Sequence, residues 1–213
     1  MPSALERILE TKIIAIVRGV SSRHIVALAE ALERGGVSCV EVTFDQTAGV
    51  GDTLDSIRAI RNALGERVCV GAGTVMTAEQ VELAAQAGAE YMISPNVDRE
   101  VIQTAKGLGK VSIPGAMTAT EAVFARQCGA DIVKLFPAGL LGAAYIKAIK
   151  APLKHIPVLA VGNVTADNCR SFLDAGAAGV GAGGSLASAA LVEAGRFGEI
   201  TAAARAYARA LGR

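Results

Sequence analysis

The feature that most constrains this chain is a strand-then-helix unit that repeats eight times at intervals of about 20–25 residues. Short β-branched runs predict the strands, and Ala-, Leu- and Glu-rich stretches between them predict the helices. The predicted strands are Ile13–Arg18, Cys39–Thr43, Val68–Gly71, Tyr91–Ser94, Lys110–Ile113, Ile132–Phe136, Val158–Val161 and Gly179–Gly181. The predicted helices are Ser22–Arg34, Asp52–Leu64, Ala78–Ala87, Asp98–Leu108, Ala119–Cys128, Ala143–Ile149, Ala166–Ala175 and Leu186–Ala194.

Such strict alternation requires parallel strands joined by helical crossovers, which leaves an open doubly wound sheet or a closed barrel. A dinucleotide-binding sheet would carry G-x-G-x-x-G after its first strand, but the chain reads Arg18-Gly19-Val20-Ser21-Ser22-Arg23 there. The count of eight instead predicts an α/β fold, a (β/α)8 TIM barrel. Because no Pro- or Ser-rich linker interrupts the repeat, residues 1–213 are expected to form a single domain with an extra helix at about residues 199–211.

The composition argues against several classes of partner. The net charge is +1 and aromatic residues make up 4% of the chain, so no nucleic-acid partner is expected. No apolar run approaches the about 20 residues that span a bilayer, and residues 1–10 lack the apolar core of a secretory signal. A cytoplasmic protein without membrane association is therefore predicted. Charged residues make up only 19% and hydrophobic residues 52%, which suggests that surface is buried between the subunits of a homo-oligomer.

Residue types that bind metals are scattered along the chain. His24 and His155 lack a second ligand at a suitable spacing. The cysteines form no C-x-x-C pair and are interpreted as small buried hydrophobic residues; they are Cys39, Cys69, Cys128 and Cys169. No metal site is therefore predicted.

One lysine emerges where a buried strand should end, in the run Asp131-Ile132-Val133-Lys134-Leu135-Phe136-Pro137. Burying an ammonium group is costly, so the pKa of such a lysine falls from its reference value of about 10.4 and favours the neutral amine. A neutral amine can attack a ketone, which makes Lys134 the best candidate for a reaction. The alternative is a lysine that reaches water or pairs with a carboxylate.

In barrels of this kind the chemistry lies at the carboxyl ends of the strands. We therefore examined which residues stand at the ends of the predicted strands. In chain order they are Arg18, Glu41 with Thr43, Gly71-Ala72-Gly73-Thr74, Ser94-Pro95-Asn96, Pro114-Gly115, Lys134 with Phe136-Pro137, Gly162-Asn163, and Gly181-Ala182-Gly183-Gly184-Ser185.

Several of these fragments together resemble one known family over nearly the whole chain, the 2-keto-3-deoxy-6-phosphogluconate (KDPG) / 4-hydroxy-2-oxoglutarate (KHG) aldolases. The matching fragments are Val40-Glu41-Val42-Thr43, Gly71-Ala72-Gly73-Thr74-Val75, Ser94-Pro95, Pro114-Gly115, Thr118-x-Thr120-Glu121, Lys134-Leu135-Phe136-Pro137 and Gly183-Gly184-Ser185. The resemblance implies a class I aldolase on a (β/α)8 barrel, commonly a homotrimer, that works through a Schiff base on a lysine without a metal or other cofactor. Its substrate would be a keto-deoxy sugar acid, KDPG or 4-hydroxy-2-oxoglutarate, cleaved to pyruvate and either glyceraldehyde 3-phosphate or glyoxylate.

By that resemblance Lys134 condenses with the C2 ketone and Glu41 is the general acid/base. The chemistry agrees, because an iminium withdraws electrons and cleavage of the C3–C4 bond then leaves an enamine instead of a free carbanion. A carboxyl group among apolar strand neighbours has a raised pKa, which suits it to carry protons. A carboxylate that only neutralises Lys134 is the simpler alternative for Glu41.

Other strand-end residues have expected binding roles. Arg18 and Thr74 suit the carboxylate of pyruvate, although Arg18 could instead form a salt bridge at the rim. Phe136 and Pro95 would wall the site against water, or be ordinary core packing. Gly162, Gly183, Gly184 and Ser185 follow the last two strands, where barrels commonly bind phosphate through backbone N–H groups. Ser185 could both cap the next helix and donate to the anion, or act as a simple cap.

Three positions depart from the family pattern. Asp45 stands where one branch has arginine four residues after the glutamate, which makes Arg18 the expected carboxylate clamp. Asn96 stands where glycine is common, and Val161-Gly162-Asn163 stands where many members read Thr-Gly-Gly. The Pro95-Asn96 pair is similar to the galactonate-type aldolases, so 2-dehydro-3-deoxy-6-phosphogalactonate is the alternative substrate.

Two hypotheses from other classes remain open at this point. A phosphosugar isomerase or epimerase on the same barrel would explain the Gly-rich loops, and it would remain active after Lys134→Ala. A non-catalytic barrel that binds a small acid or acts as a scaffold would leave the pKa of Lys134 at its ordinary value.

Overall fold

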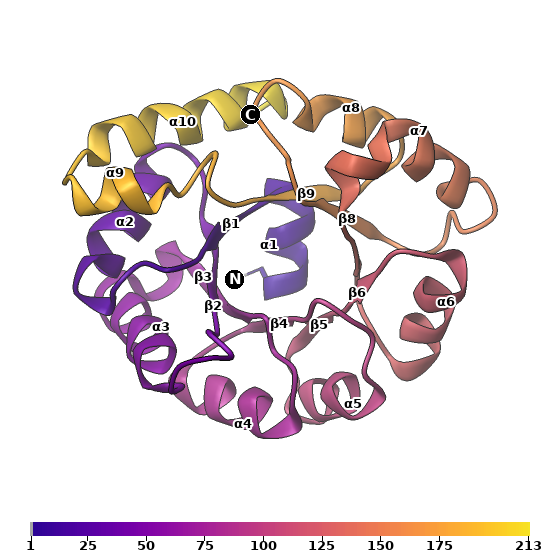
Figure 1. Cartoon of the computed structure of the whole chain (residues 1–213), viewed down its shortest axis with the longest axis horizontal. Helices are drawn as coiled ribbons and strands as arrows, with labels where there is room; N and C mark the ends of the chain where they lie inside the picture. The colour runs from indigo at the N-terminus through magenta and orange to yellow at the C-terminus, as the bar shows by residue number, and fades with distance from the viewer. Residues whose placement is uncertain (1) are drawn as a thin grey trace.

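The barrel predicted from the eightfold repeat is confirmed by the computed structural model, which describes residues 2–213. Its strands are all parallel and form one sheet in the order β5-β4-β3-β2-β1-β9-β8-β7-β6, surrounded by helices (Figure 1). The strands are β1 Ile13–Val17, β2 Cys39–Thr43, β3 Cys69–Gly73, β4 Tyr91–Ile93, β5 Val111–Ile113, β6 Gly115–Ala116, β7 Val133–Leu135, β8 Val158–Val161 and β9 Gly179–Ala182. The helices are α1 Ala4–Thr11, α2 Ser22–Arg34, α3 Gly51–Leu64, the 3-10 turn η1 Gly65–Arg67, α4 Ala78–Ala87, α5 Arg99–Gly107, α6 Ala119–Cys128, α7 Ala138–Lys150, α8 Cys169–Asp174, α9 Ala189–Glu193 and α10 Phe197–Ala210.

The fifth barrel strand is divided at Pro114, which separates β5 from β6. Proline has no N–H to donate to a neighbouring strand, so it interrupts a ladder. The first half pairs with β4 and the second half pairs with β7. Across the seam the Lys134 N–H donates to the carbonyl of Pro114 at 2.9 Å, and the Ser112 N–H donates to the Asp131 carboxylate at 2.8 Å. Together with the pairing of β6 and β7, these contacts close the sheet into a barrel.

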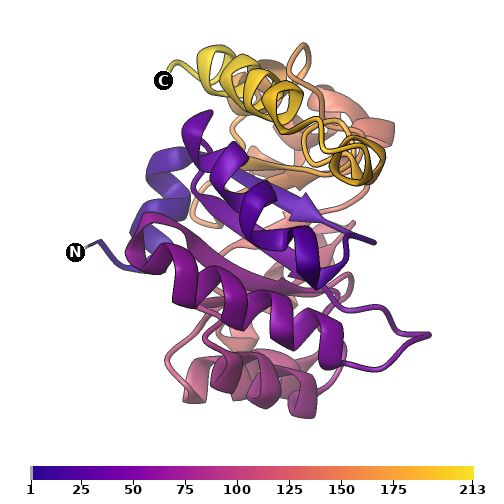
Figure 2. The ribbon, with the colours of Figure 1, turned by 90° about the vertical axis from the view of Figure 1, so that its left-hand side faces the viewer.

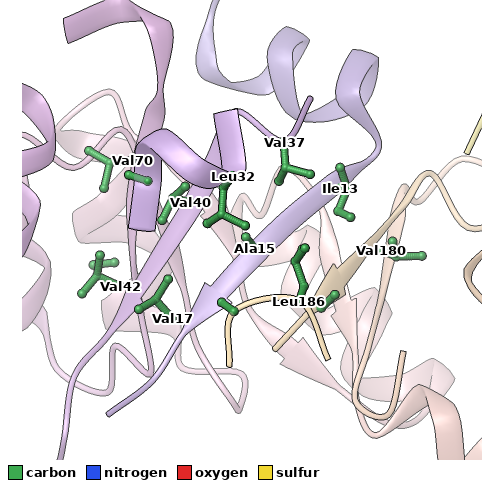
Figure 3. Close-up of a cluster of buried hydrophobic side chains, with 14 of the residues drawn as sticks. Ile13, Ala15, Val17, Leu32, Val37, Val40, Val42, Val70, Val180 and Leu186 are labelled. Carbon is green, nitrogen blue, oxygen red and sulfur yellow. The ribbon is translucent and has the colours of Figure 1, made fainter. Parts of the chain in front are cut away.

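Successive side chains of a strand point to opposite sides of the sheet, so they alternate between the barrel interior and the layer beneath the helices. On β2, Val40 and Val42 face outward and pack in the layer between sheet and helices, where Figure 3 shows them with Val17, Leu32 and Val37. Glu41, which lies between them, faces into the barrel. The same alternation on β7 sends Lys134 inward. The two ionisable residues of the predicted site therefore point into the interior because of strand geometry alone.

Helix α1 was not predicted, because residues 1–10 were considered only as a possible signal. Its signature is a capping box in which the Ser3 hydroxyl accepts from the Glu6 N–H while the Glu6 carboxylate accepts from Ser3. Ile8 packs into the interior cluster, and Arg7 donates to the carbonyl of Glu66 at 2.7 Å. Figures 1 and 2 show α1 at the end of the barrel opposite the one where the strands point. It therefore closes the floor of the barrel.

Several predicted boundaries are wrong, each for a local reason. Helix α8 starts at Cys169 instead of Ala166, because Thr165 and Asn168 first form a turn with reciprocal side chain–backbone hydrogen bonds. Helix α9 starts after Ser188, whose hydroxyl accepts from the Leu191 N–H. Helix α7 begins five residues before the predicted Ala143, with a non-helical residue at Gly142. No helix within residues 2–213 is both long and apolar enough to cross a membrane.

Candidate active site

A cavity of about 640 Å³ opens where the strands end, and every residue predicted for the site lines it. These residues are Arg18, Glu41, Thr74, Pro95, Lys134, Phe136, Gly162, Gly183, Gly184 and Ser185. Six further lining residues were not predicted as site residues, namely Ile16, Val161, Asn163, Val164, Thr165 and Gly181. The strand ends that are far apart in sequence therefore converge on one space.

The Lys134 side chain enters this cavity from β7 and is only 7% exposed. Burial lowers its pKa below the ordinary value, and the positive charge of Arg18 acts in the same direction, while Glu41 opposes both. The Nζ atom lies 5.2 Å from the centre of the Phe136 ring, which is itself 42% exposed at the rim. The surroundings of Lys134 therefore favour the neutral form of its amine. An aromatic ring lies close to the amine on the side of the rim.

Glu41 enters the same cavity from β2 and is 1% exposed. Its Oε2 atom is buried without a hydrogen-bond partner, a costly state for a carboxylate. Burial raises the pKa of Glu41, although the positive charges of Lys134 and Arg18 work against this rise. An unsatisfied carboxyl oxygen beside a nucleophile is ready to accept a proton or a hydrogen bond from a bound molecule.

Two glycines of β3 make room for large side chains inside the barrel. A Cβ atom at Gly73 would lie 1.8 Å from Glu41 Oε1, and one at Gly71 would lie 2.2 Å from the Tyr91 ring. No residue with a side chain fits at either position without displacing its neighbour. The Gly71-Ala72-Gly73 segment thus sets where the Glu41 carboxyl group lies.

Arg18 extends from the end of β1, and its Nη2 donates to the Thr74 hydroxyl at 3.1 Å. Both groups face the cavity and offer donors to an anion, and among residues 2–213 Arg18 and Lys134 are the cations that line it. Asp45 does not take part, because its carboxylate accepts from the Thr47 N–H at 2.8 Å and from the Thr47 hydroxyl at 2.7 Å. The departure at Asp45 therefore stabilises a loop, and the pair Arg18–Thr74 remains as the candidate anion clamp.

Ser185 lines the cavity, but its hydroxyl is engaged elsewhere. Its Oγ lies 2.8 Å from the carbonyl oxygen of Val164 and 2.7 Å from the hydroxyl of Tyr207 on α10. The prediction that Ser185 caps the next helix is wrong, because Ser188 occupies that position. The side chain thus fastens the loop after β9 to α10, and only the backbone N–H of Ser185 remains to meet an anion.

Asn163 was named at a strand end without a role in the site, and Thr165 was named only as a residue near the start of a helix. Asn163 has a positive φ of 52°, and its carbonyl accepts from the Asn168 side chain at 3.0 Å. The Gly162-Asn163 pair after β8 was the only signal available in the sequence. Within residues 2–213 no group of three or more His, Cys, Asp and Glu side chains could hold a metal ion.

Comparison with known proteins places these features in context. A family model described as KDPG and KHG aldolase matches residues 5–203. The 2-dehydro-3-deoxy-6-phosphogalactonate aldolase of Escherichia coli (strain K12) is 41% identical over 175 residues, which cover 82% of this chain and 83% of that relative.

Two solved structures are similar throughout their length. A structure described as native KDPGal has 39% identity and a TM-score of 0.84, covering 93% of both chains. A KDPG aldolase from Legionella pneumophila, solved with pyruvate captured as a covalent carbinolamine intermediate, has 25% identity and a TM-score of 0.86. The match covers 97% of this chain and 98% of that one.

Proposed function

Because the chain belongs to the KDPG and KHG aldolase family of class I carbon–carbon lyases, we propose that it cleaves 2-dehydro-3-deoxy-6-phosphogalactonate to pyruvate and glyceraldehyde 3-phosphate. The observation that carries the reaction is the burial of Lys134 and Glu41 in one cavity, with the pKa of the amine lowered and that of the carboxyl raised. Relatives of the galactonate type, at 41% and 39% identity, support this substrate over the gluconate-type phosphate that the sequence analysis put first.

In this proposal the neutral Lys134 amine attacks the C2 ketone and forms a carbinolamine. Glu41 protonates the departing hydroxyl, so that water leaves and an iminium remains. The Glu41 carboxylate then takes the proton of the C4 hydroxyl, the C3–C4 bond breaks, and its electron pair becomes part of an enamine while the aldehyde departs. Glu41 returns the proton to C3, water hydrolyses the resulting iminium to pyruvate and the free amine, and the proton released in this step returns to Glu41.

The remaining residues orient the substrate. Arg18 and Thr74 hold the C1 carboxylate, because a guanidinium fork and a hydroxyl match its two oxygens. Gly162, Gly183, Gly184 and the Ser185 backbone, which follow β8 and β9 in the wall of the same cavity, receive the phosphate. Phe136 and Pro95 limit the access of water to the iminium. Val161 and Asn163, which depart from the family pattern, lie in the cavity wall where they can affect the choice between C4 epimers.

Trapping the covalent intermediate tests the reaction. Pyruvate with borohydride should attach a reduced three-carbon adduct to Lys134, located by mass spectrometry of the peptides. The Lys134→Ala variant should carry none, whereas Lys147→Ala, which removes an exposed lysine of α7, should be labelled like the wild type. If the wild-type protein carries no adduct, the proposal is wrong.

Initial rates of pyruvate release test the substrate. The galactonate-type phosphate should give the highest kcat/KM, followed by the gluconate-type phosphate and by 4-hydroxy-2-oxoglutarate, which lacks a phosphate. A higher kcat/KM for the gluconate-type phosphate would return the assignment to the other branch of the family while leaving the Schiff-base chemistry intact.

A further inference from the structure

Thr74, whose hydroxyl accepts a hydrogen bond from the Arg18 guanidinium, has an unfavourable backbone conformation. Its φ is 55°, in the left-handed region that a β-branched residue rarely adopts. Such a conformation persists only where surrounding contacts hold it in place. Thr74 follows β3 directly and lines the cavity. The contacts that hold its backbone therefore also set the direction in which its hydroxyl points.

A chain of two glutamine side chains supplies them. Gln46 Nε2 donates to the Thr74 carbonyl at 2.7 Å, and Gln80 Nε2 donates to Gln46 Oε1 at 3.1 Å. Gln80 Oε1 in turn accepts from the Met76 N–H at 2.7 Å. Gln46 lies in the loop after β2 and Gln80 in the first turn of α4. The chain therefore ties two loops together around the Thr74 turn.

Arg18 stands between two cavities. Together with Thr74 it lines both the active-site cavity and a second one of about 560 Å³, which lies beneath the loop that follows β2. The second cavity also contains the side chains of Asp45 and Asp52. Hydrogen bonds from Thr47 lower the pKa of Asp45, and the positive charge of Arg18 lowers it further, so that the Asp45 carboxylate attracts the guanidinium. Arg18 thus has both the space and the electrostatic attraction to move away from the active site.

We propose that Gln46 is a positioning residue, which fixes the Thr74 turn and thereby keeps Arg18 directed at the carboxylate of the substrate. The inference rests on the proposed function, in which Arg18 and Thr74 hold that carboxylate. Gln46 itself lines only the second cavity and does not reach the reacting atoms. Its loss should weaken substrate binding and leave the chemistry at Lys134 nearly unchanged.

The Gln46→Met variant tests this, because methionine has a similar length and no charge but cannot donate to the Thr74 carbonyl. The concentration of pyruvate that gives half-maximal borohydride trapping on Lys134 should rise about tenfold, because a misdirected Arg18 loses about one charge-assisted hydrogen bond to the carboxylate of pyruvate. The maximal extent of trapping and kcat should stay within about twofold, because no group that reacts has been changed. Gln103→Met, at an exposed glutamine on α5, is the matched control and should behave as the wild type.

An Arg18→Ala background separates positioning from a general structural effect. If Gln46 acts mainly through Arg18, Gln46→Met should raise the half-maximal concentration much less there than in the wild type, because only the Thr74 hydroxyl remains to be misplaced. Gln80→Met, which removes the next link, should act in the same direction as Gln46→Met in the wild-type background. An unchanged half-maximal concentration in both glutamine variants would overturn the inference, as would equal effects with and without Arg18. Failure to trap pyruvate on the wild type would instead overturn the proposed function, and this inference with it.

Discussion

At the scale of single residues, the site depends on a glycine, which leaves space for a neighbouring side chain, as much as on the reactive side chains. Glu41 fits beside Gly73 only because that position has no Cβ atom. The sequence showed that Gly71-Ala72-Gly73 follows a strand, but not that its open space belongs to a carboxyl group on the neighbouring strand. That relation appears once β2 and β3 pair in register, with Thr43 opposite Gly73.

A Gly73→Ala variant should therefore lose activity without losing the fold. The added methyl group would displace the Glu41 carboxyl group from its place in the cavity, and kcat should fall about 100-fold, within the usual contribution of a general acid/base. Steady-state kinetics of pyruvate release measures the effect. Gly107→Ala, at a position where a Cβ meets nothing within 4 Å, is the control and should retain full activity. Equal kcat values in the two variants would show that the Glu41 position is not critical.

The raised pKa of Glu41 also predicts how stability depends on pH. Between the ordinary pKa of a glutamate and the higher value in the folded protein, the folded state binds a proton that the unfolded state does not. The contribution of Glu41 to the free energy of unfolding is therefore fully present below the ordinary pKa and is lost as the pH rises through the folded value. The Glu41→Gln variant should lack this decline.

Urea denaturation of both proteins at several pH values from about 4.5 to 8 measures that difference. The stability of the wild type relative to Glu41→Gln should decrease across this range. A difference that stays constant, or that grows with pH, would mean that the Glu41 carboxyl group is already ionised in the folded protein.

At the scale of elements, the predictions succeeded where a pattern is local and failed where contacts are distant. Helices α2, α4 and α6 have the predicted bounds, because periodicity and end signals lie within the segment. Strand β6 was missed because Pro114 divides one barrel strand between two partners. The Ser185 hydroxyl was misassigned because its partner Tyr207 lies 22 residues further along the chain. No pattern near Ser185 could have shown that contact.

Helix α1 provides a test of its own, because its capping box was visible in the sequence and overlooked. Ser3→Ala removes the hydroxyl that accepts from the Glu6 N–H, and should lower the free energy of unfolding by about 1 kcal/mol. Ser21→Ala is the matched control, since Ser21 precedes α2 but its side chain makes no capping hydrogen bond. Equal denaturation midpoints for the two variants would show that α1 adds little to the stability of the barrel.

At the scale of the whole molecule, the hydrophobic composition predicts a homo-oligomer, and the family resemblance implies that it is a homotrimer. The chain has 52% hydrophobic and 19% charged residues, and large apolar side chains such as Leu140 and Met117 remain exposed in the single chain. Sedimentation velocity should give a species of about three times 21.7 kDa that persists on dilution. A mass equal to that of one chain would refute the prediction.

The closed floor of the barrel has a consequence for kinetics. Below Lys134 the interior is filled by apolar side chains and covered by α1, so molecules enter and leave only past the rim where Phe136 lies. In the proposed reaction the three-carbon fragment stays bonded to Lys134 at the closed end of the cavity, and the aldehyde departs toward the rim. The proposal therefore implies sequential release with the aldehyde first out, and in the synthetic direction it implies that pyruvate binds first.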